Sequence, residues 1–209
     1  MTKDQAINKV LTLARNEIGY KEKNSNIYLD DKNANAGSGN YTKYARDLDA
    51  VTNFYNGAKN GFAWCDVFVD WLFYKSFGAN AAMKMLCQPE KSAGAGCLYS
   101  ASYYRNNGCW TSNPAPGEQI FFTYSGGEVS HTGIVEQVNG QQVITIEGNT
   151  SDQVARRTYA VNDSRIYGYG IPRWEYATGE AVDPSPVTPD VPQRDTLRKG
   201  DVGDDVAEL

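Results

Sequence analysis

The sequence predicts an α+β fold in which N-terminal helices pack on an antiparallel β-sheet. Three observations lead to this fold class: helical periodicity in the first half, short strand-like runs after Pro116, and a proline-rich segment after Tyr176. Helices followed by strands are typical of α+β domains. With 209 residues, of which 41% are hydrophobic, the chain can bury one sizeable core.

An amphipathic helix is predicted first, over residues 3–18. Thr2 and Gln5 have the pattern of a capping box, and Gly19 ends the helix. Apolar side chains follow helical spacing at Ile7, Val10, Leu11, Ala14 and Ile18. Residues 24–41 are rich in Asn, Gly, Ser and Asp, and they are predicted to form a long loop.

A second helix is predicted to start near Cys65 and to stop at Gly78. It is apolar on most of its faces, so we expect it to be buried, with Cys65 in its first turn. Beyond Pro116, strand composition appears in QIFFTY, TGIVEQV, QQVITIE and VARRTYA. Asn139-Gly140 lies between the second and third of these runs and favours a hairpin.

The domain organisation follows from composition. Residues 1–176 are predicted to be the folded domain, 177–194 a proline-rich linker, and 195–209 the start of something too short to fold alone. The segment from Ala177 to Leu209 carries 3 basic and 8 acidic residues, which accounts for the whole net charge of −5. The body is therefore neutral.

Charge and hydropathy exclude several classes of partner. Without a basic stripe, nucleic acid and anionic membranes are not expected as ligands. No apolar run approaches the roughly 20 residues that cross a bilayer. The N-terminus lacks the apolar core of a secretory signal, so we expect a protein made in the cytoplasm. Because the chain has one histidine and no CxxC pair, a metal-dependent mechanism is not favoured and no cofactor is expected.

Cys65 is the candidate nucleophile. A thiolate at a helix N-terminus faces free backbone N–H groups and the positive end of the helix dipole, both of which lower its pKa. The same N–H groups can stabilise an oxyanion after attack on a carbonyl. The competing interpretation is a small buried core residue. A cysteine after a loop, with a histidine further along the chain, favours the thiol hydrolase.

His131 begins the run TGIVEQV, where it is placed to reach a helix terminus; the alternative is a surface histidine at a loop edge. Glu147 and Asn149 end the returning strand, and either one can fix the imidazole tautomer. A two-residue turn that pairs 138 with 141 would place Glu147 on the opposite face from His131. A three-residue bulged loop pairs 138 with 142 and places 131, 147 and 149 on one face, so we predict the bulged loop.

The chain resembles the cysteine, histidine-dependent amidohydrolase/peptidase family (CHAP), a papain-like group that cuts peptidoglycan. The resemblance rests on WCDVFV, HTGIVEQV, VITIEGNTS, the opening ARNEIGYKE, and PGEQIFF, where Gly117-Glu118 replaces the Gly-Asp of many relatives. It implies that Cys65 is the nucleophile, His131 the general base and acid, Glu147 the orienting group, and Asn149 a fourth member. Many such domains are endolysins of bacteriophages or prophages.

The resemblance implies a protein that binds bacterial peptidoglycan and hydrolyses an amide bond through a cysteine thioacyl-enzyme; we expect it to be a monomer. That bond is either the muramoyl–alanine amide or one in the stem or cross-bridge, and the enzyme would reach the wall after lysis or release. Two alternatives remain: a thiol acyltransferase that uses an amine acceptor, and a catalytically silent wall-binding module. In the aromatic segment 98–110 and beside the nucleophile, Tyr103 and Trp64 are predicted to contact substrate.

Two further features follow from the resemblance. The tail DTLRKGDVGDDVAEL looks like the first helix of a small peptidoglycan-binding domain. Some relatives bind calcium in an acidic loop before the nucleophile, but Asp47 and Asp49 lack the dense alternating ligands of a calcium loop. The cysteines other than Cys65 are expected to be buried thiols or a structural pair; they are Cys87, Cys97 and Cys109.

Overall fold

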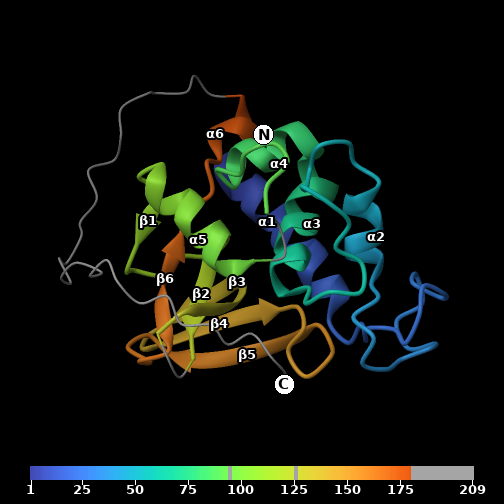
Figure 1. The fold of residues 1–209 in the computed structure, drawn as a ribbon. Coiled ribbons are helices and arrows are strands. Elements are labelled where there is room, and N and C mark those ends of the chain that lie inside the picture. The colour runs from blue at the N-terminus through green and yellow to red at the C-terminus, as the bar shows by residue number, and fades with distance from the viewer. Residues whose placement is uncertain (94–95, 125–126, 180–209) are drawn as a thin grey trace, which may run out of the picture.

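The structure is a computed structural model that describes residues 1–93, 96–124 and 127–179. Figure 1 shows its helices stacked on one side of a twisted sheet. The helices are α1 (Lys3–Glu17), α2 (Lys43–Asp49), α3 (Cys65–Phe77), α4 (Ala79–Met85), α5 (Cys97–Asn106) and α6 (Glu175–Thr178). The strands are β1 (Trp110–Thr111), β2 (Gln119–Thr123), β3 (Val129–Asn139), β4 (Gln142–Glu147), β5 (Ala155–Ala160) and β6 (Ile166–Gly170).

The predicted α+β class is confirmed. The sheet has the order β1-β6-β2-β3-β4-β5, and every neighbouring pair is antiparallel. The helix predicted over residues 3–18 is α1, and its capping box is formed in both directions between Thr2 and Gln5. The helix predicted from Cys65 is α3, and the four predicted strands are β2 to β5.

The main core lies between the helices and the sheet. α3 packs on β3 and β4, and α5 packs on β3 and β6. An aromatic group fills the space between α2, α3 and the loop after α1: it comprises Tyr20, Tyr44, Trp64, Phe68 and Trp71. A second, smaller cluster is built from strand residues alone, namely Ile120, Phe122, Val135, Val143 and Tyr169.

The predicted bulged loop between β3 and β4 is wrong. Asn139 pairs with Gln142, so the turn has the two residues Gly140 and Gln141. The extra residue lies inside β3 instead, at Glu136, where the register shifts between Val135 and Gln137. The bulge aims the Glu136 carboxylate at two guanidinium groups, those of Arg15 and Arg156. Between the bulge and the start of β3, the pairing of β3 with β4 places the side chains of His131 and Glu147 on the same face of the sheet, as predicted.

No helix among the described residues is long and apolar enough to cross a membrane. The predicted domain end near Tyr176 falls within α6, and Gly179 caps that helix in a left-handed conformation. The predicted linker and the start of a peptidoglycan-binding domain lie almost entirely outside the described residues.

Candidate active site

Cys65 is the first residue of α3, and the residue is only 5% exposed. The residue before it, Trp64, makes no side-chain capping bond, so the backbone N–H groups of the first turn are left without a side-chain cap. A thiolate placed there is stabilised by those N–H groups and by the helix dipole. The local fold therefore gives Cys65 the environment that its sequence position predicts.

A close approach between α3 and the sheet sets the position of the nucleophile helix. Gly148, directly after β4, lies so near this helix that a Cβ added to it would sit 2.6 Å from the Cβ of Phe68. A side chain at this position would push the sheet away from the first turns of α3. The glycine thus keeps Cys65 near the end of β4, where Glu147 lies.

His131 and Glu147 form a buried pair on neighbouring strands. The Nε2 atom of His131 is 2.9 Å from Oε2 of Glu147, and the carboxylate is 1% exposed. The other oxygen of Glu147 accepts a hydrogen bond from Thr145. Because Nε2 faces the carboxylate, the remaining ring nitrogen, Nδ1, is the one available to Cys65.

Gly133 makes room for this pair. A Cβ at Gly133 would lie 2.5 Å from Cγ of Glu147. The missing side chain lets the Glu147 carboxylate lie flat across β3 toward His131, and the ring of Phe122 stacks on the imidazole from the next strand at 5.8 Å between centroids. The imidazole is therefore held at its edge by Glu147 and on its face by Phe122.

The charges of the thiol and the imidazole are coupled. Burial opposes a charged imidazole, but the Cys65 thiolate and Glu147 outweigh burial and raise the pKa of His131 to about 9. The pKa of Cys65 is held well below that of an ordinary thiol, first by a hydrogen bond from Cys97 and then by His131, although burial acts in the opposite direction. Cys65 and His131 are thus stable together as a thiolate and an imidazolium.

The side chain of Asn149 contacts the long loop after α1. Asn149 follows the end of β4 with φ +54°, and its side-chain Nδ2 donates to Oδ1 of Asn40 at 3.3 Å. That contact ties the β4 end to the long loop after α1. The structure brings Cys65, His131 and Glu147 together, and it does not support Asn149 as a fourth member of the group.

Trp64 is not a substrate-contact residue in this structure, because it has no exposed surface. Its Nε1 donates to Glu22 at 2.7 Å, and its ring packs against Tyr44. The expectation was wrong because the large ring is needed to fill the core beside the nucleophile. Tyr103 is half-buried on α5, where its hydroxyl accepts a hydrogen bond from the Ala93 backbone.

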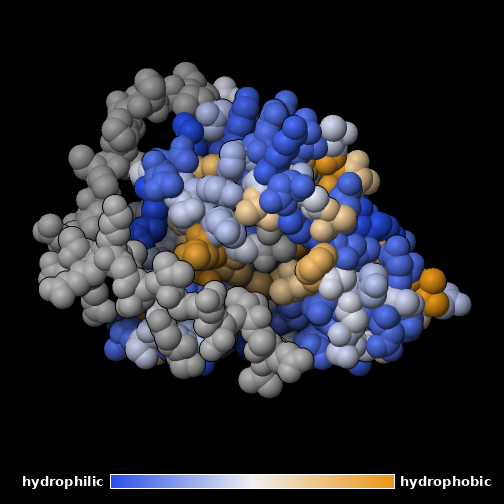
Figure 2. All heavy atoms as spheres, viewed as in Figure 1, coloured by the Kyte–Doolittle hydropathy of each residue, from blue (hydrophilic) through white to orange (hydrophobic). Residues whose placement is uncertain are grey.

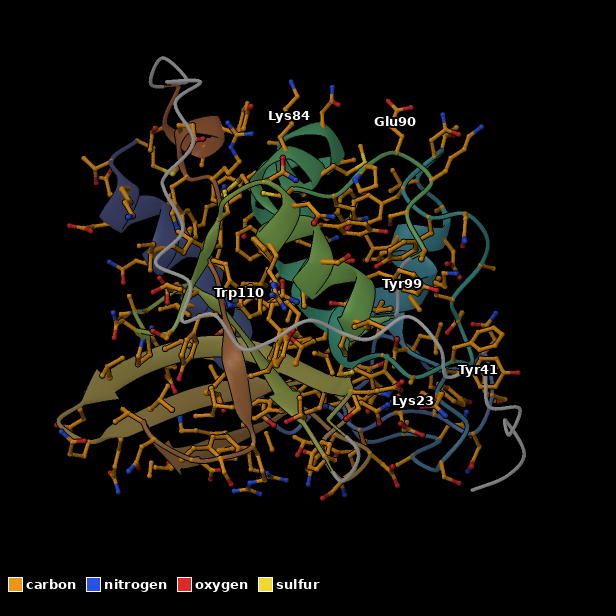
Figure 3. The ribbon with its side chains drawn as sticks, turned by 60° about the vertical axis from the view of Figure 1, so that its left-hand side comes forward. Lys23, Tyr41, Lys84, Glu90, Tyr99 and Trp110 are labelled. Atoms are coloured by element: carbon orange, nitrogen blue, oxygen red, sulfur yellow. The ribbon has the colours of Figure 1, made fainter. Side chains whose placement is uncertain are left out.

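Two exposed tyrosines were not singled out from the sequence, although the first of them lies in the aromatic segment 98–110. Tyr99, labelled in Figure 3, lies in the first turn of α5 and is 54% exposed. Tyr124 is 51% exposed, and its ring centroid is 6.5 Å from that of His131. Partial burial, followed by the charges of Glu147 and Cys65, raises the pKa of Tyr124. Its place directly after the strand that faces His131 was the available signal.

Cys97 is a third residue that sequence reasoning did not place at the site. It is the first residue of α5, and its sulfur is 3.4 Å from that of Cys65. All four cysteines are free thiols. Nothing in the spacing of 32 residues indicates this contact, because it depends on how α5 packs beside α3.

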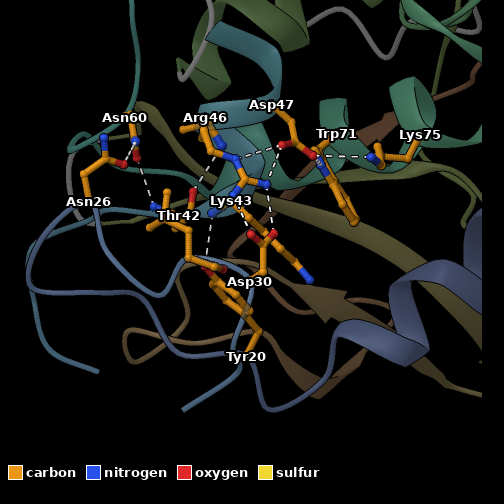
Figure 4. A network of polar contacts seen from close by, with 12 residues as sticks. Tyr20, Asn26, Asp30, Thr42, Lys43, Arg46, Asp47, Asn60, Trp71 and Lys75 are labelled. Carbon is orange, nitrogen blue, oxygen red and sulfur yellow. Dashed lines mark hydrogen bonds and ion pairs between the residues drawn. The ribbon is translucent and has the colours of Figure 1, made fainter. Parts of the chain in front are cut away.

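Asp47 and Asp49, the acidic residues considered as calcium ligands, are both engaged by other protein groups. Asp47 is held by Arg46, Trp71 and Lys75, as Figure 4 shows. Both oxygens of Asp49 accept backbone hydrogen bonds, from Lys59 and Asn60. Within residues 1–93, 96–124 and 127–179, no group of three or more His, Cys, Asp or Glu side chains is placed to hold a metal ion.

A cysteine at the start of a buried helix, packed on an antiparallel sheet that carries a histidine and its acidic partner, is the arrangement of the papain-like α+β class. Residues 57–149 match the family model of the CHAP domain. The match begins shortly before Cys65 and ends at Asn149, so it contains the three clustered residues.

Two solved structures are similar at low identity. The crystal structure of Ly7917 aligns with a TM-score of 0.46 and 16% identity, covering 79% of this chain and 62% of that one. The crystal structure of Ly7917 with the hydrolyzing product of MDP gives a TM-score of 0.43 with the same identity and coverage. The aligned region is less than two thirds of the Ly7917 chain. No curated protein matches this chain.

Proposed function

We propose that this protein hydrolyses an amide bond of bacterial peptidoglycan through a thioacyl-enzyme on Cys65. The observation that carries the proposal is the coupled site: a thiol at the N-terminus of α3, and an imidazole whose far nitrogen is 2.9 Å from a buried carboxylate. A hydrolase needs a nucleophile that is charged at neutral pH and a partner that can both donate and accept a proton. The lowered pKa of Cys65 supplies the charged nucleophile, and the raised pKa of His131 supplies the proton donor.

The reaction has two stages. The Cys65 thiolate attacks the amide carbonyl carbon, and the developing oxyanion is stabilised by N–H groups at the start of α3. The C–N bond then breaks as His131 gives its proton to the leaving amine, which leaves a thioester on Cys65. In the second stage neutral His131 takes a proton from water, hydroxide attacks the thioester, and the acid product departs from the regenerated thiolate.

Glu147 acts as the orienting group in this proposal. Its position on Nε2 keeps Nδ1 directed to the thiol, and its negative charge stabilises the imidazolium that exists before amine release. Asn149, the rival for this role, is bonded to Asn40. The carboxylate is therefore the better-supported third member.

The substrate surface next to this site is aromatic and exposed. Figure 2 shows hydrophobic residues gathered in the hollowed middle of one face, between the helices and the strands. We assign substrate contacts to Tyr99 and Tyr124, since both rings are exposed. Tyr99 is on α5, the helix that begins with Cys97, and the ring of Tyr124 lies near that of His131. Such rings offer an apolar face for a sugar or peptide and a hydroxyl for a polar group.

The decisive experiment is mass spectrometry of fragments released from purified Gram-positive walls. The wild type should release stem peptides or cut cross-bridges, and Cys65→Ala should release none while retaining its fold. The masses then distinguish a muramoyl–alanine amidase from an endopeptidase. Adding a free amine tests for acyl transfer, because a transferase would yield amine adducts in place of acids.

Cys109→Ala is the matched control, because Cys109 is also a free thiol whose pKa is lowered, to about 7, by its neighbour Cys87. This variant should release fragments at the wild-type rate. Equal release by wild type and Cys65→Ala would refute the thioacyl mechanism. Wall binding without any release by the wild type would instead favour the silent binding module.

A further inference from the structure

Two free cysteines meet at the ends of two different helices. Cys65 begins α3 and Cys97 begins α5, their sulfur atoms are 3.4 Å apart, and each residue is 5% exposed. A sulfur–sulfur distance of this size is a hydrogen-bond contact between one S–H and the other sulfur. The proposed hydrolysis uses only one of these thiols, so the second needs a separate explanation.

The contact is held in place by a second link between the same two helix ends. Ser100, one turn into α5, donates to Oδ2 of Asp66 at 2.7 Å, and Asp66 directly follows the nucleophile. Gln119 on β2 donates to the other oxygen of Asp66 at 3.0 Å. All three side chains are buried. Cys97 therefore faces Cys65 from a fixed position.

We infer that Cys97 is a positioning residue for the nucleophile: its S–H donates a hydrogen bond to the Cys65 thiolate and holds that sulfur in place for attack. The inference rests on the proposed function, in which Cys65 is the nucleophile. It adds a side chain from α5 to the group formed by Cys65, His131 and Glu147.

The direction of the hydrogen bond follows from the surroundings of the two sulfurs. Cys65 has the imidazole of His131 beside it, which favours the thiolate, whereas Cys97 interacts with the negative charges of Cys65 and Asp66. The pKa of Cys97 is accordingly raised well above that of an ordinary thiol, first by its bond to Cys65 and then by burial. Cys97 therefore keeps its proton and is the donor.

The test measures the titration of Cys65 directly. Iodoacetamide alkylation of Cys65 is followed against pH in buffer containing a phosphine, and peptide mass spectrometry separates Cys65 from the other cysteines. Loss of one hydrogen bond to the thiolate should raise the midpoint by about one pH unit or more in Cys97→Ala. Cys97→Ser keeps a donor and should recover at least half of that shift.

Two further measurements separate positioning from a structural role. The acidic limb of the pH profile of kcat/KM should move with the alkylation midpoint, whereas a packing defect would lower activity at every pH without moving it. Cys97→Val provides a second donor-free variant if the alanine protein does not fold. Cys109→Ala should leave the midpoint unchanged.

An unchanged midpoint in Cys97→Ala and Cys97→Val would overturn the inference, and so would a serine variant that titrates like the alanine one. This failure is distinct from failure of the proposed function, because alkylation needs no wall substrate. Release of wall fragments by Cys65→Ala would refute the hydrolytic role of Cys65 whatever the midpoint.

Discussion

Each member of the site depends on one or two immediate neighbours. His131 is held at Nε2 by Glu147 and on its face by Phe122, while Cys65 is held by the helix start and by Cys97. Because these contacts stabilise the charged forms of both groups, they determine the pH range in which the protein can act.

The activity should fall at alkaline pH. The folded-state pKa of His131 is about 9, above its ordinary 6.5, so the imidazolium persists through neutral pH and is lost as pH rises through about 9. Leaving-amine protonation is lost with it. A profile of kcat/KM on wall fragments should therefore show a plateau near neutral pH and an alkaline limb near 9. A limb near 6.5 would contradict the coupling of His131 to its two neighbours.

By the same linkage, the His131 contacts stabilise the fold fully below pH 6.5 and progressively less as pH rises to about 9. His131→Gln should therefore be less stable than the wild type at pH 6, and the difference should shrink by pH 10. Chemical denaturation at the two pH values measures it.

Gly133→Ala should reduce activity strongly while leaving the nucleophile intact. The added Cβ would meet Cγ of Glu147 at 2.5 Å, so the carboxylate has to move away from His131. We expect a loss in kcat of at least about tenfold, from an imidazole that has lost its orienting partner. Gly57→Ala is the matched control, because a Cβ there meets no atom within 4 Å. Equal rates in the two variants would show that Glu147 needs no space at Gly133.

At the scale of elements, α3 carries two buried carboxylates, Asp66 and Asp70, one turn apart. Burial raises the pKa of Asp66 to about 7, against its bonds to Ser100 and Gln119. The pKa of Asp70 is raised well above its usual range, again first by burial and then by Asp66. The nucleophile helix is therefore most stable when these acids are protonated.

Asp66→Asn should weaken the dependence of stability on pH. Because the pKa of Asp66 is higher in the folded than in the unfolded protein, protonated Asp66 stabilises the fold fully below the unfolded-state pKa near 4. This contribution is lost as pH rises through the folded-state pKa of about 7. Asparagine does not titrate, so the variant lacks this loss. The free energy of unfolding of the variant minus that of the wild type should therefore increase by at least about 1 kcal/mol from pH 5 to pH 8. Urea denaturation at both pH values measures the gain; a constant difference would refute the assignment.

The elements with clear periodicity were predictable from sequence. α1 and α3 have strong apolar patterns, and β2 to β5 have strand composition. α5 was not predicted as a helix, because its buried positions mix small and polar residues such as Ser100 and Ala101 with Cys97 and Tyr104. β6 was missed since the run IYGYG contains two glycines, which are depleted in strands.

Some residues of the site were also predictable from the sequence, and others were not. Cys65, His131 and Glu147 could be found because each stands at or near the end of a predictable element. The bulge at Glu136 could not, because it is set by Arg15 and Arg156 from distant parts of the chain. Trp64 was misassigned because burial of a large ring depends on packing between elements, which a local pattern does not contain.

At the scale of the whole molecule, residues 1–93, 96–124 and 127–179 form one main core. Trp174, just before that helix, is buried against Phe73 at 5.5 Å between ring centroids. The acidic residues that give the chain its net charge of −5 lie beyond this point.

A chain ending at residue 179 should therefore keep the stability and the chemistry of the full sequence. We expect the same urea midpoint and the same rate on soluble wall fragments, because the site and the buried core described above are formed by residues before 180. A chain ending at residue 170 removes Trp174 and should unfold at lower urea. Reduced activity of the 1–179 protein would assign the final segment a role in catalysis.

The meeting of Cys65 and Cys97 also makes the protein sensitive to its redox surroundings. Their sulfurs, 3.4 Å apart, need to approach by roughly 1.4 Å to form a disulfide. Hydrogen peroxide would oxidise the Cys65 thiolate to a sulfenic acid, and the Cys97 thiol would then displace water to close the bond. Peroxide should abolish hydrolysis and dithiothreitol should restore it, whereas peroxide-treated Cys97→Ser should recover poorly. The same contact that prepares the nucleophile thus gives it a reversible form of protection in oxidising surroundings.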